Sequence, residues 1–187
     1  MMNDQSCQVQ NEESLVRRAQ QRDQEAFSQL YEQYFDKIYR YLILRIGNQM
    51  EAEDLTQQVF LKALKSINAF QWKGIPFSAW LYRIAHNLAV DCLRKRTRSP
   101  EECLEPSDAV SDSNPQLEVE RKSDIEQLVK ACRGLTQAQR EVISLRFASE
   151  LPIAYVAKIM GKSEGAIKAL QHSAIVALRK IIVVENE

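Results

Sequence analysis

Four polar side chains recur at a spacing of three to four residues in one stretch of the sequence, and together they could bind a polyanion. They are Arg83, Asn87, Asp91 and Arg94, and this period places them on one side of an α-helix. Arginine and asparagine can donate to phosphates and read the edges of bases. A basic stripe is nevertheless a weak indicator, because most such stripes are only solvated and cations near a helix C-terminus also complement its dipole.

Another side of the same predicted helix must hold the polar stripe in place. Trp80, Ile84, Leu88 and Cys92 follow the same period and predict a face that packs on a core.

The loop before this helix, residues 68–76, contains Phe70, Trp72 and Lys73. Exposed aromatic rings beside a lysine can stack on unpaired bases. Anchoring of the loop to the core explains the aromatic residues equally well.

The whole chain has the apolar spacing of helices. With five Gly and five Pro in 187 residues, it lacks the turn residues that strands need. We therefore expect an all-α fold with two small helical domains, residues 1–98 and 117–187, joined by an acidic flexible linker at 99–116.

The formal net charge of zero hides an uneven distribution. Residues 1–98 carry 14 basic and 11 acidic side chains, residues 99–124 carry 2 and 8, and residues 125–187 carry 9 and 6. The corresponding sums are +3, −6 and +3. Two mildly basic ends flank an acidic middle, so the neutral total does not exclude a nucleic-acid partner.

The second block ends in a pattern of helix, short turn and helix. Residues 151–160 predict the first helix, Gly161 ends it, and Ser163 caps a second helix. In DNA-binding versions of this motif, the second helix enters the major groove with its N-terminal residues against the bases. Helical hairpins are common, so the motif alone supports DNA binding only weakly.

The remaining composition argues against a metal or cofactor site and against membrane insertion. The four cysteines lie far apart, and only two histidines are present, so we expect no bound metal and no cofactor. No segment approaches the roughly 18 apolar residues of a membrane span. We expect a cytoplasmic protein.

Four strings in the two blocks give a specific resemblance. Taken in order, they are residues 51–61, 80–96, 135–142 and 165–168, with the sequences EAEDLTQQVFL, WLYRIAHNLAVDCLRKR, LTQAQREV and GAIK. Together the two blocks resemble the bacterial sigma factors of the extracytoplasmic-function group, which keep only the helical regions two and four. The resemblance covers nearly the whole chain, and the second string is the most specific.

The resemblance implies a non-enzymatic initiation factor that binds core RNA polymerase through the β′ coiled coil and the β flap, recognises promoter DNA, and is restrained by an anti-sigma factor. The residues matching the β′-binding surface are Asp54, Gln57, Gln58 and Leu61. Those matching the surface for the minus-10 element are Phe70, Trp72, Lys73, Arg83, Asn87, Asp91, Arg94 and Lys95. Those matching the surface for the minus-35 element are Lys162, Ser163, Glu164, Gly165, Lys168, Ala169 and His172.

This sequence departs from the family pattern in its predicted recognition helix. Many relatives have arginine where this chain has Leu170, Ser173 and Ile175. Fewer phosphate contacts should weaken binding and flatten its salt dependence.

Two other interpretations remain. A stand-alone helix-turn-helix regulator would bind palindromic sites as a symmetric dimer. The second is a helical enzyme or metal sensor, but His86 and His172 have no cysteine or carboxylate at the spacing of metal ligands.

Overall fold

The computed structural model describes residues 4–72, 75–98 and 127–185, and these residues form helices and connecting turns without a strand. The first block contains α1 (Asp4–Gln20), α2 (Gln24–Ile46), α3 (Gln49–Ser66), a 3₁₀ turn (Ile67–Ala69) and α4 (Phe77–Arg98). After a helical stretch at 127–133 come α6 (Gln137–Ile143), a π-helical turn (Ser144–Ala148), α7 (Ile153–Met160) and α8 (Glu164–Glu185). The all-α prediction is confirmed. The predicted linker 99–116 lies outside the described residues.

The helix ends in the first block follow from local chemistry. The Asp23 side chain accepts a hydrogen bond from the Ala26 amide at the start of α2. Gly47, in the left-handed region at φ 76°, ends the same helix, where a side chain would be strained. Asn48 then caps α3 by accepting from the Glu51 amide at 3.0 Å.

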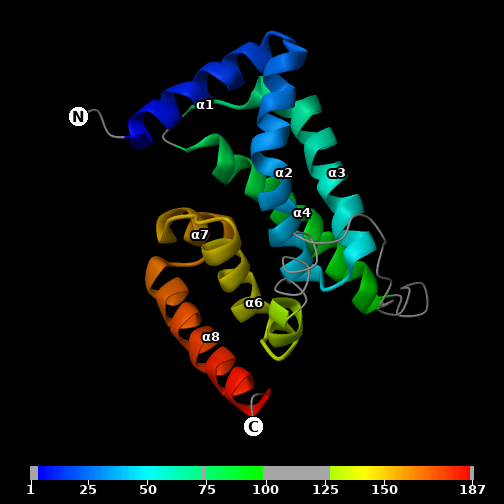
Figure 1. The fold of residues 1–187 in the computed structure, drawn as a ribbon, viewed down its shortest axis with the longest axis vertical. Coiled ribbons are helices and arrows are strands. Elements are labelled where there is room, and N and C mark those ends of the chain that lie inside the picture. The colour runs from blue at the N-terminus through cyan, green and yellow to red at the C-terminus, as the bar shows by residue number, and fades with distance from the viewer. Residues whose placement is uncertain (1–3, 73–74, 99–126, 186–187) are drawn as a thin grey trace, which may run out of the picture.

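The second block is bounded in the same way. Thr136 and Gln139 form a capping box at the start of α6, in which each residue satisfies an amide of the other. Gly161, at φ 62°, ends α7. The Ser163 side chain then accepts from the Ala166 amide at 3.2 Å and caps α8. The predicted helix-turn-helix is therefore present as α7 and α8 (Figure 1).

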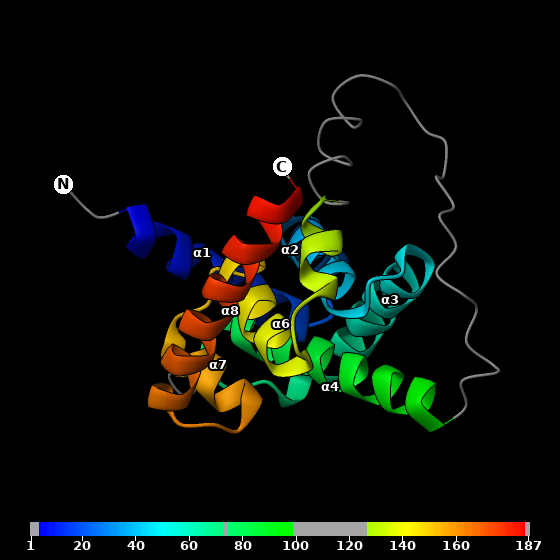
Figure 2. The same ribbon diagram turned by 90° about the horizontal axis from the view of Figure 1, so that it is seen from below.

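The two blocks pack against each other and share one hydrophobic core. In both ribbon views, α6 lies between α8 and the first block (Figures 1 and 2). The side chains of the second block that join the core of the first are Val129, Val142, Leu145, Leu151, Val156, Ala157 and Ile167. Two smaller regions thus form one body in the described part of the chain.

A buried carboxylate lies at this junction. Glu141 of α6 is 2% exposed. It accepts a hydrogen bond from the Tyr41 hydroxyl at 2.7 Å, forms an ion pair with Arg45, and has one oxygen 2.9 Å from His86 Nδ1. Burial alone would raise the pKa of Glu141, but the hydrogen bond with His86 and the charge of Arg45 outweigh it and hold the pKa below its ordinary value. We call these four residues the Glu141 cluster.

Candidate nucleic-acid and polymerase interfaces

The polar stripe on α4 is exposed along its length. Arg83, Asn87, Asp91, Arg94 and Lys95 all lie on the surface. The helix is held from behind by buried side chains, namely Phe77, Ala79, Leu81, Tyr82, Ala85, Leu88 and Ala89. A helix fixed on one side and free on the other can present donors to a nucleic-acid strand without rearrangement.

The predicted packed face of α4 is present, but the sequence did not reveal its strongest anchors. Leu88 is buried, whereas Trp80, Ile84 and Cys92 are half-buried against the core. The most enclosed side chains of the helix include Tyr82, which meets Tyr41 edge-on at 5.7 Å between ring centroids. The packed face is therefore wider than the four-residue stripe that the period alone indicated.

The basic residues at the C-terminal end of α4 are of two kinds: one contacts the rest of the protein and the others are exposed. Arg96 donates to the Ile46 carbonyl at 3.0 Å and pairs with Glu51 at the start of α3. Cys92 donates to the same carboxylate at 3.4 Å. Arg96 is thus used to join α4 to the α2–α3 turn, while Arg94 and Lys95 stay exposed.

The loop before α4 is anchored by its aromatic residues. Phe70 is 5% exposed, and its ring packs against Trp72, Phe77 and Trp80 with centroids 5.2 to 5.6 Å apart. Gln20 of α1 donates to the Phe70 carbonyl at 2.9 Å. The core-anchoring interpretation therefore accounts for Phe70 as the structure places it.

The other two residues singled out in this loop are Trp72 and Lys73. Trp72 is half-buried. Lys73 lies outside the described residues.

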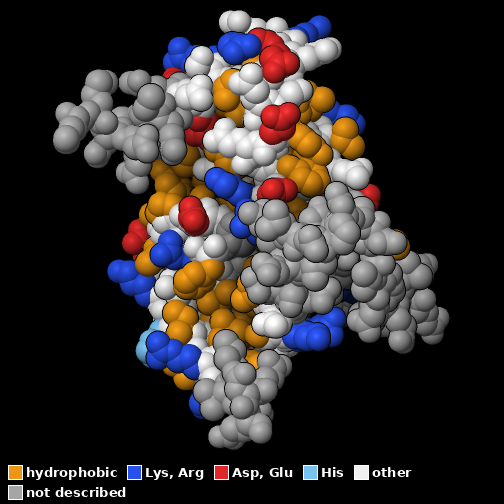
Figure 3. Space-filling view, viewed as in Figure 1, with side chains coloured by type: hydrophobic (Ala, Val, Ile, Leu, Met, Phe, Trp, Pro, Cys, Tyr) orange, Lys and Arg blue, Asp and Glu red, His pale blue; other side chains and the backbone are white. Residues whose placement is uncertain are grey.

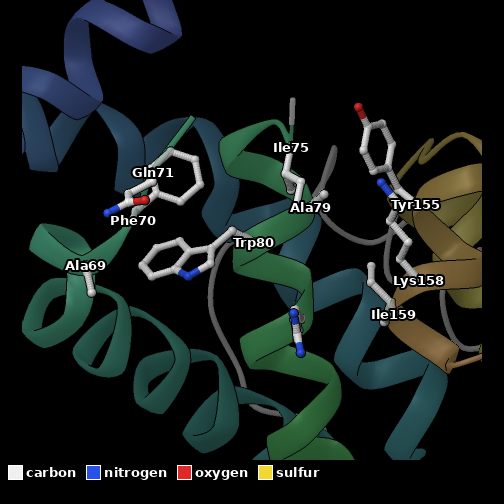
Figure 4. A pocket seen from close by; sticks show the side chains of 10 residues that line it. Ala69, Phe70, Gln71, Ile75, Ala79, Trp80, Tyr155, Lys158 and Ile159 are labelled. Carbon is white, nitrogen blue, oxygen red and sulfur yellow. The ribbon is translucent and has the colours of Figure 1, made fainter. Parts of the chain in front are cut away.

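A cavity of about 420 Å³ opens between this loop and the second block (Figure 4). Phe70, Ile75 and Trp80 line it from the first block, and Tyr155 and Lys158 of α7 line it from the second. The helix-turn-helix therefore lies next to the loop before α4 that contains Phe70 and Trp72.

A second exposed surface lies on α3. Asp54, Gln57 and Leu61 are exposed and Gln58 is half-buried, and Gln58 donates to the Asp54 carboxylate at 2.6 Å. Leu61 is 56% exposed and lies beside these polar side chains on the same helix.

The sequence did not single out the apolar neighbours of this surface. Leu64 is 51% exposed one turn after Leu61. Tyr31 of α2 is 37% exposed and its ring lies 4.7 Å from that of Phe60. Leu64 and Tyr31 could have been found in the sequence as apolar residues that lie outside the main apolar stripe of their helices.

All seven predicted contacts at the start of α8 are exposed. They are Lys162, Ser163, Glu164, Gly165, Lys168, Ala169 and His172. Ile167 and Ala174 are buried and hold the helix against α6 and α7. On the face drawn in Figure 3, basic side chains lie in small separate groups rather than in one broad patch.

The three α8 positions where the resemblance leads to an expectation of arginine have defined contacts in the structure. Leu170 and Ile175 are half-buried and pack on the two core clusters. Ser173 accepts a hydrogen bond from Gln139 at 2.7 Å. Two of these positions thus contribute to packing and the third joins α8 to α6.

The described residues give no support to a metal site. Among them, no group of three or more His, Cys, Asp and Glu side chains could hold an ion. Within the same residues, no helix has the length and apolar character to cross a membrane.

Comparison with known proteins identifies both blocks. The model of Sigma-70 region 2 matches residues 30–99, and the model of Sigma-70, region 4 matches residues 132–180. The chain is 41% identical over 170 residues to the ECF RNA polymerase sigma factor BldN of Streptomyces coelicolor, a match that covers 90% of this chain and 64% of BldN. It is 31% identical over 180 residues to the ECF sigma factor SigW of Bacillus subtilis, covering 88% and 93% of the two chains.

The fold also resembles a solved complex. The sigma factor RpoE of Bartonella quintana, in a co-crystal structure with the anti-sigma factor NepR, superposes with a TM-score of 0.70 at 27% identity. The match covers 84% of this chain and 97% of that one. The similarity therefore extends over both blocks.

Proposed function

Because this chain belongs to the ECF family of RNA polymerase sigma factors, we propose that it binds core RNA polymerase and directs it to promoters carrying particular minus-10 and minus-35 elements. It acts by binding, without catalysis and without a cofactor. We place it in the bacterial cytoplasm, where transcription begins.

The exposed stripe on α4 is the observation that carries the proposal. Arg83, Asn87, Arg94 and Lys95 offer donors along one side of a helix whose other side is buried. Donors to phosphates and base edges on a rigid support suit a strand of the minus-10 element as it unpairs. Binding to the unpaired strand offsets the cost of unpairing it, so promoter opening requires no hydrolysis.

The burial of Phe70 limits which residues of the loop before α4 can contact a displaced base. Because the Phe70 ring is packed in the core, we assign it to holding the loop rather than to stacking on a base in this conformation. The half-buried Trp72 and the neighbouring Lys73 keep their proposed contact with a displaced base.

The α3 surface is proposed to bind the β′ coiled coil. Asp54, Gln57 and Gln58 supply polar contacts, and Leu61 supplies an apolar one next to them. A polar rim around an exposed apolar residue is typical of a protein-binding surface. The second block is proposed to reach the β flap and to place the start of α8 in the major groove of the minus-35 element.

An anti-sigma factor is proposed as the inhibitory partner. The support is the similarity over both blocks to a sigma factor solved with its anti-sigma factor.

The test combines core polymerase with purified variants. We expect Asn87→Ala to impair opening of promoter DNA while leaving the affinity for core polymerase unchanged. We expect Asp54→Ala, on the other surface, to weaken core binding. Equal loss of both properties in the two variants would refute the assignment of the faces, and absence of any complex with core polymerase would refute the function.

A further inference from the structure

Helix α1 lies alongside both ends of the loop before α4 (Figure 1). It precedes residues 30–99, which match Sigma-70 region 2, and no residue of α1 is among the proposed DNA or polymerase contacts. Buried apolar side chains, among them Val16, pack α1 on the core. Glu12 and Gln20 lie four residues before and after Val16, and therefore on the same side of the helix.

Gln20 holds the end of the loop that follows α3. Its side-chain amide donates to the Ile67 carbonyl and to the Phe70 carbonyl, both at 2.9 Å. The Phe70 carbonyl belongs to the first peptide group after the 3₁₀ turn, and the plane of that group sets the direction in which the chain continues toward Trp72. Because hydrogen bonds are directional, two of them from one planar amide fix the orientation of the backbone there.

Glu12 holds the other end of the loop, where α4 begins. Its carboxylate accepts hydrogen bonds from the Tyr34 hydroxyl and from the backbone amide of Ser78. Ser78 is the second residue of α4, and an amide at that position has no acceptor within its own helix. Glu12 and Gln20 thus connect α1 to the chain on both sides of the loop.

Trp72 has no polar contact of its own to hold its ring. Its Nε1 is buried and has no hydrogen-bond partner among the described residues. The ring meets that of Phe70 edge-on at 5.2 Å between centroids, and Phe70 meets Phe77 at 5.6 Å. This apolar packing keeps the ends of the loop close together, while the direction of its backbone depends on the hydrogen bonds from α1.

We infer that Gln20 and Glu12 are positioning residues for recognition of the minus-10 element, because they hold the loop in the conformation in which Trp72 meets a displaced base. The inference rests on the proposed function and extends it to α1. Glu12 is buried and Gln20 is half-buried, so both act through the loop rather than on the DNA. A loop that is already ordered at both ends loses less conformational entropy when a base binds.

The test measures how far DNA binding depends on the displaced base. The polymerase complex binds forked DNA carrying a minus-10 sequence selected by the wild-type complex, and each base of the unpaired strand is replaced in turn by an abasic site. At the position of the displaced base, the wild-type complex should bind the intact fork at least about fivefold more tightly than the abasic one, which is the low end of the range for one stacked base. We call this ratio the base dependence.

The first variant is Gln20→Glu, which keeps the shape of the side chain but places a carboxylate against two carbonyls. The base dependence should fall below about twofold, since the loss of one hydrogen bond corresponds to a two- to tenfold change. The affinities for the abasic fork and for core polymerase should stay unchanged. Gln21→Glu makes the same change at the neighbouring exposed glutamine, so it is the matched control and should keep the wild-type value. Gln20→Ala removes the donors without adding a charge and replaces Gln20→Glu if that variant loses helical content.

Two variants of Glu12 separate positioning from a general loss of stability. Glu12→Ala removes the acceptor for the Ser78 amide and should lower the base dependence as Gln20→Glu does. Glu12→Gln keeps an oxygen that can accept from Ser78, and its amide group can donate to the Tyr34 hydroxyl, so it should retain the wild-type value. A base dependence that followed the urea midpoints of the free variants, rather than the presence of these donors and acceptors, would show a purely structural role and overturn the inference.

Failure of the positioning role can be distinguished from failure of the function. A wild-type base dependence in folded Gln20→Ala and Glu12→Ala, or an equal fall in Gln21→Glu, would overturn the positioning role and leave the proposed function intact. Absence of a complex between the wild type and core polymerase, or a wild-type complex that depends on no base of the unpaired strand, would instead overturn the proposed function and the inference with it.

Discussion

Two arginines on the same helix, two residues apart, give the sharpest prediction. Arg94 is exposed on the polar stripe of α4. Arg96 is half-buried, donates to the Ile46 carbonyl and pairs with Glu51. We expect Arg94→Ala to weaken DNA binding while leaving the stability of the fold nearly unchanged. We expect Arg96→Ala to lower mainly the stability of the fold.

The magnitudes follow from these contacts. A hydrogen bond from a charged donor contributes about 1.5 kcal/mol at the low end of its range, and a partly exposed ion pair adds about 0.5 kcal/mol. Arg96→Ala should therefore cost about 2 kcal/mol, or a fall of about 4–8 °C in Tm for a chain of this size. Arg94→Ala should change stability by less than about 0.5 kcal/mol, because its side chain is exposed.

The DNA measurement separates the two arginines independently. If Arg94 contacts a phosphate of the unpaired strand, its loss removes one released counterion and lowers the slope of log affinity against log salt by about 0.7. The assay is binding of the polymerase complex to forked minus-10 DNA between about 50 and 200 mM salt, beside urea denaturation of each free variant. Equal stability loss in both variants, or an unchanged slope for Arg94→Ala, would refute the division of tasks along α4.

Three further predictions concern stability and pH. The pKa of Glu141 is held below its ordinary value of 4.5. Its contribution to stability is therefore present above pH 4.5 and is lost as the pH falls through the lowered pKa. Glu141→Gln should reduce this decrease of the free energy of unfolding at acid pH. Burial raises the pKa of Glu12 despite the hydrogen bond from Tyr34, so its contribution has the opposite sign and is lost as the pH rises through the raised pKa. Glu12→Gln should accordingly raise Tm at pH 7, and a fall would show that the charged form is favoured. Finally, Thr136→Ala removes the capping box with Gln139 and should cost about 1 kcal/mol in urea denaturation, whereas no change would mean that tertiary contacts alone fix the start of α6.

The parts of the structure that could be predicted are those encoded by neighbouring residues. Gly161 ends α7 and Ser163 caps α8 as predicted because capping and left-handed turns depend on a few adjacent positions. The exposed stripe of α4 follows from helical periodicity in the same way.

The unpredicted parts depend on partners distant in sequence. Glu141 meets its partners across 55 to 100 positions, and no local pattern specifies that pairing. In the sequence, Arg96 is one more cation near a helix C-terminus. Only the structure shows that it contacts Glu51 and the Ile46 carbonyl. A charged residue's role is therefore least predictable where it joins two elements.

The limited charge of α8 has a consequence for how the chain selects promoters. The exposed cations on and just before this helix are Lys162, Lys168, Arg179 and Lys180, so even if all four met phosphates the minus-35 contact would have a salt slope of only about −3.6. A helix with so few contacts binds weakly alone, and α4 meets its strand only as the DNA unpairs. Each contact becomes effective when polymerase holds both blocks against the same promoter, because two weak interactions then act as one bivalent interaction. A chain whose two DNA contacts are each weak would thus bind promoters mainly as part of the polymerase complex, which limits its unproductive binding to DNA.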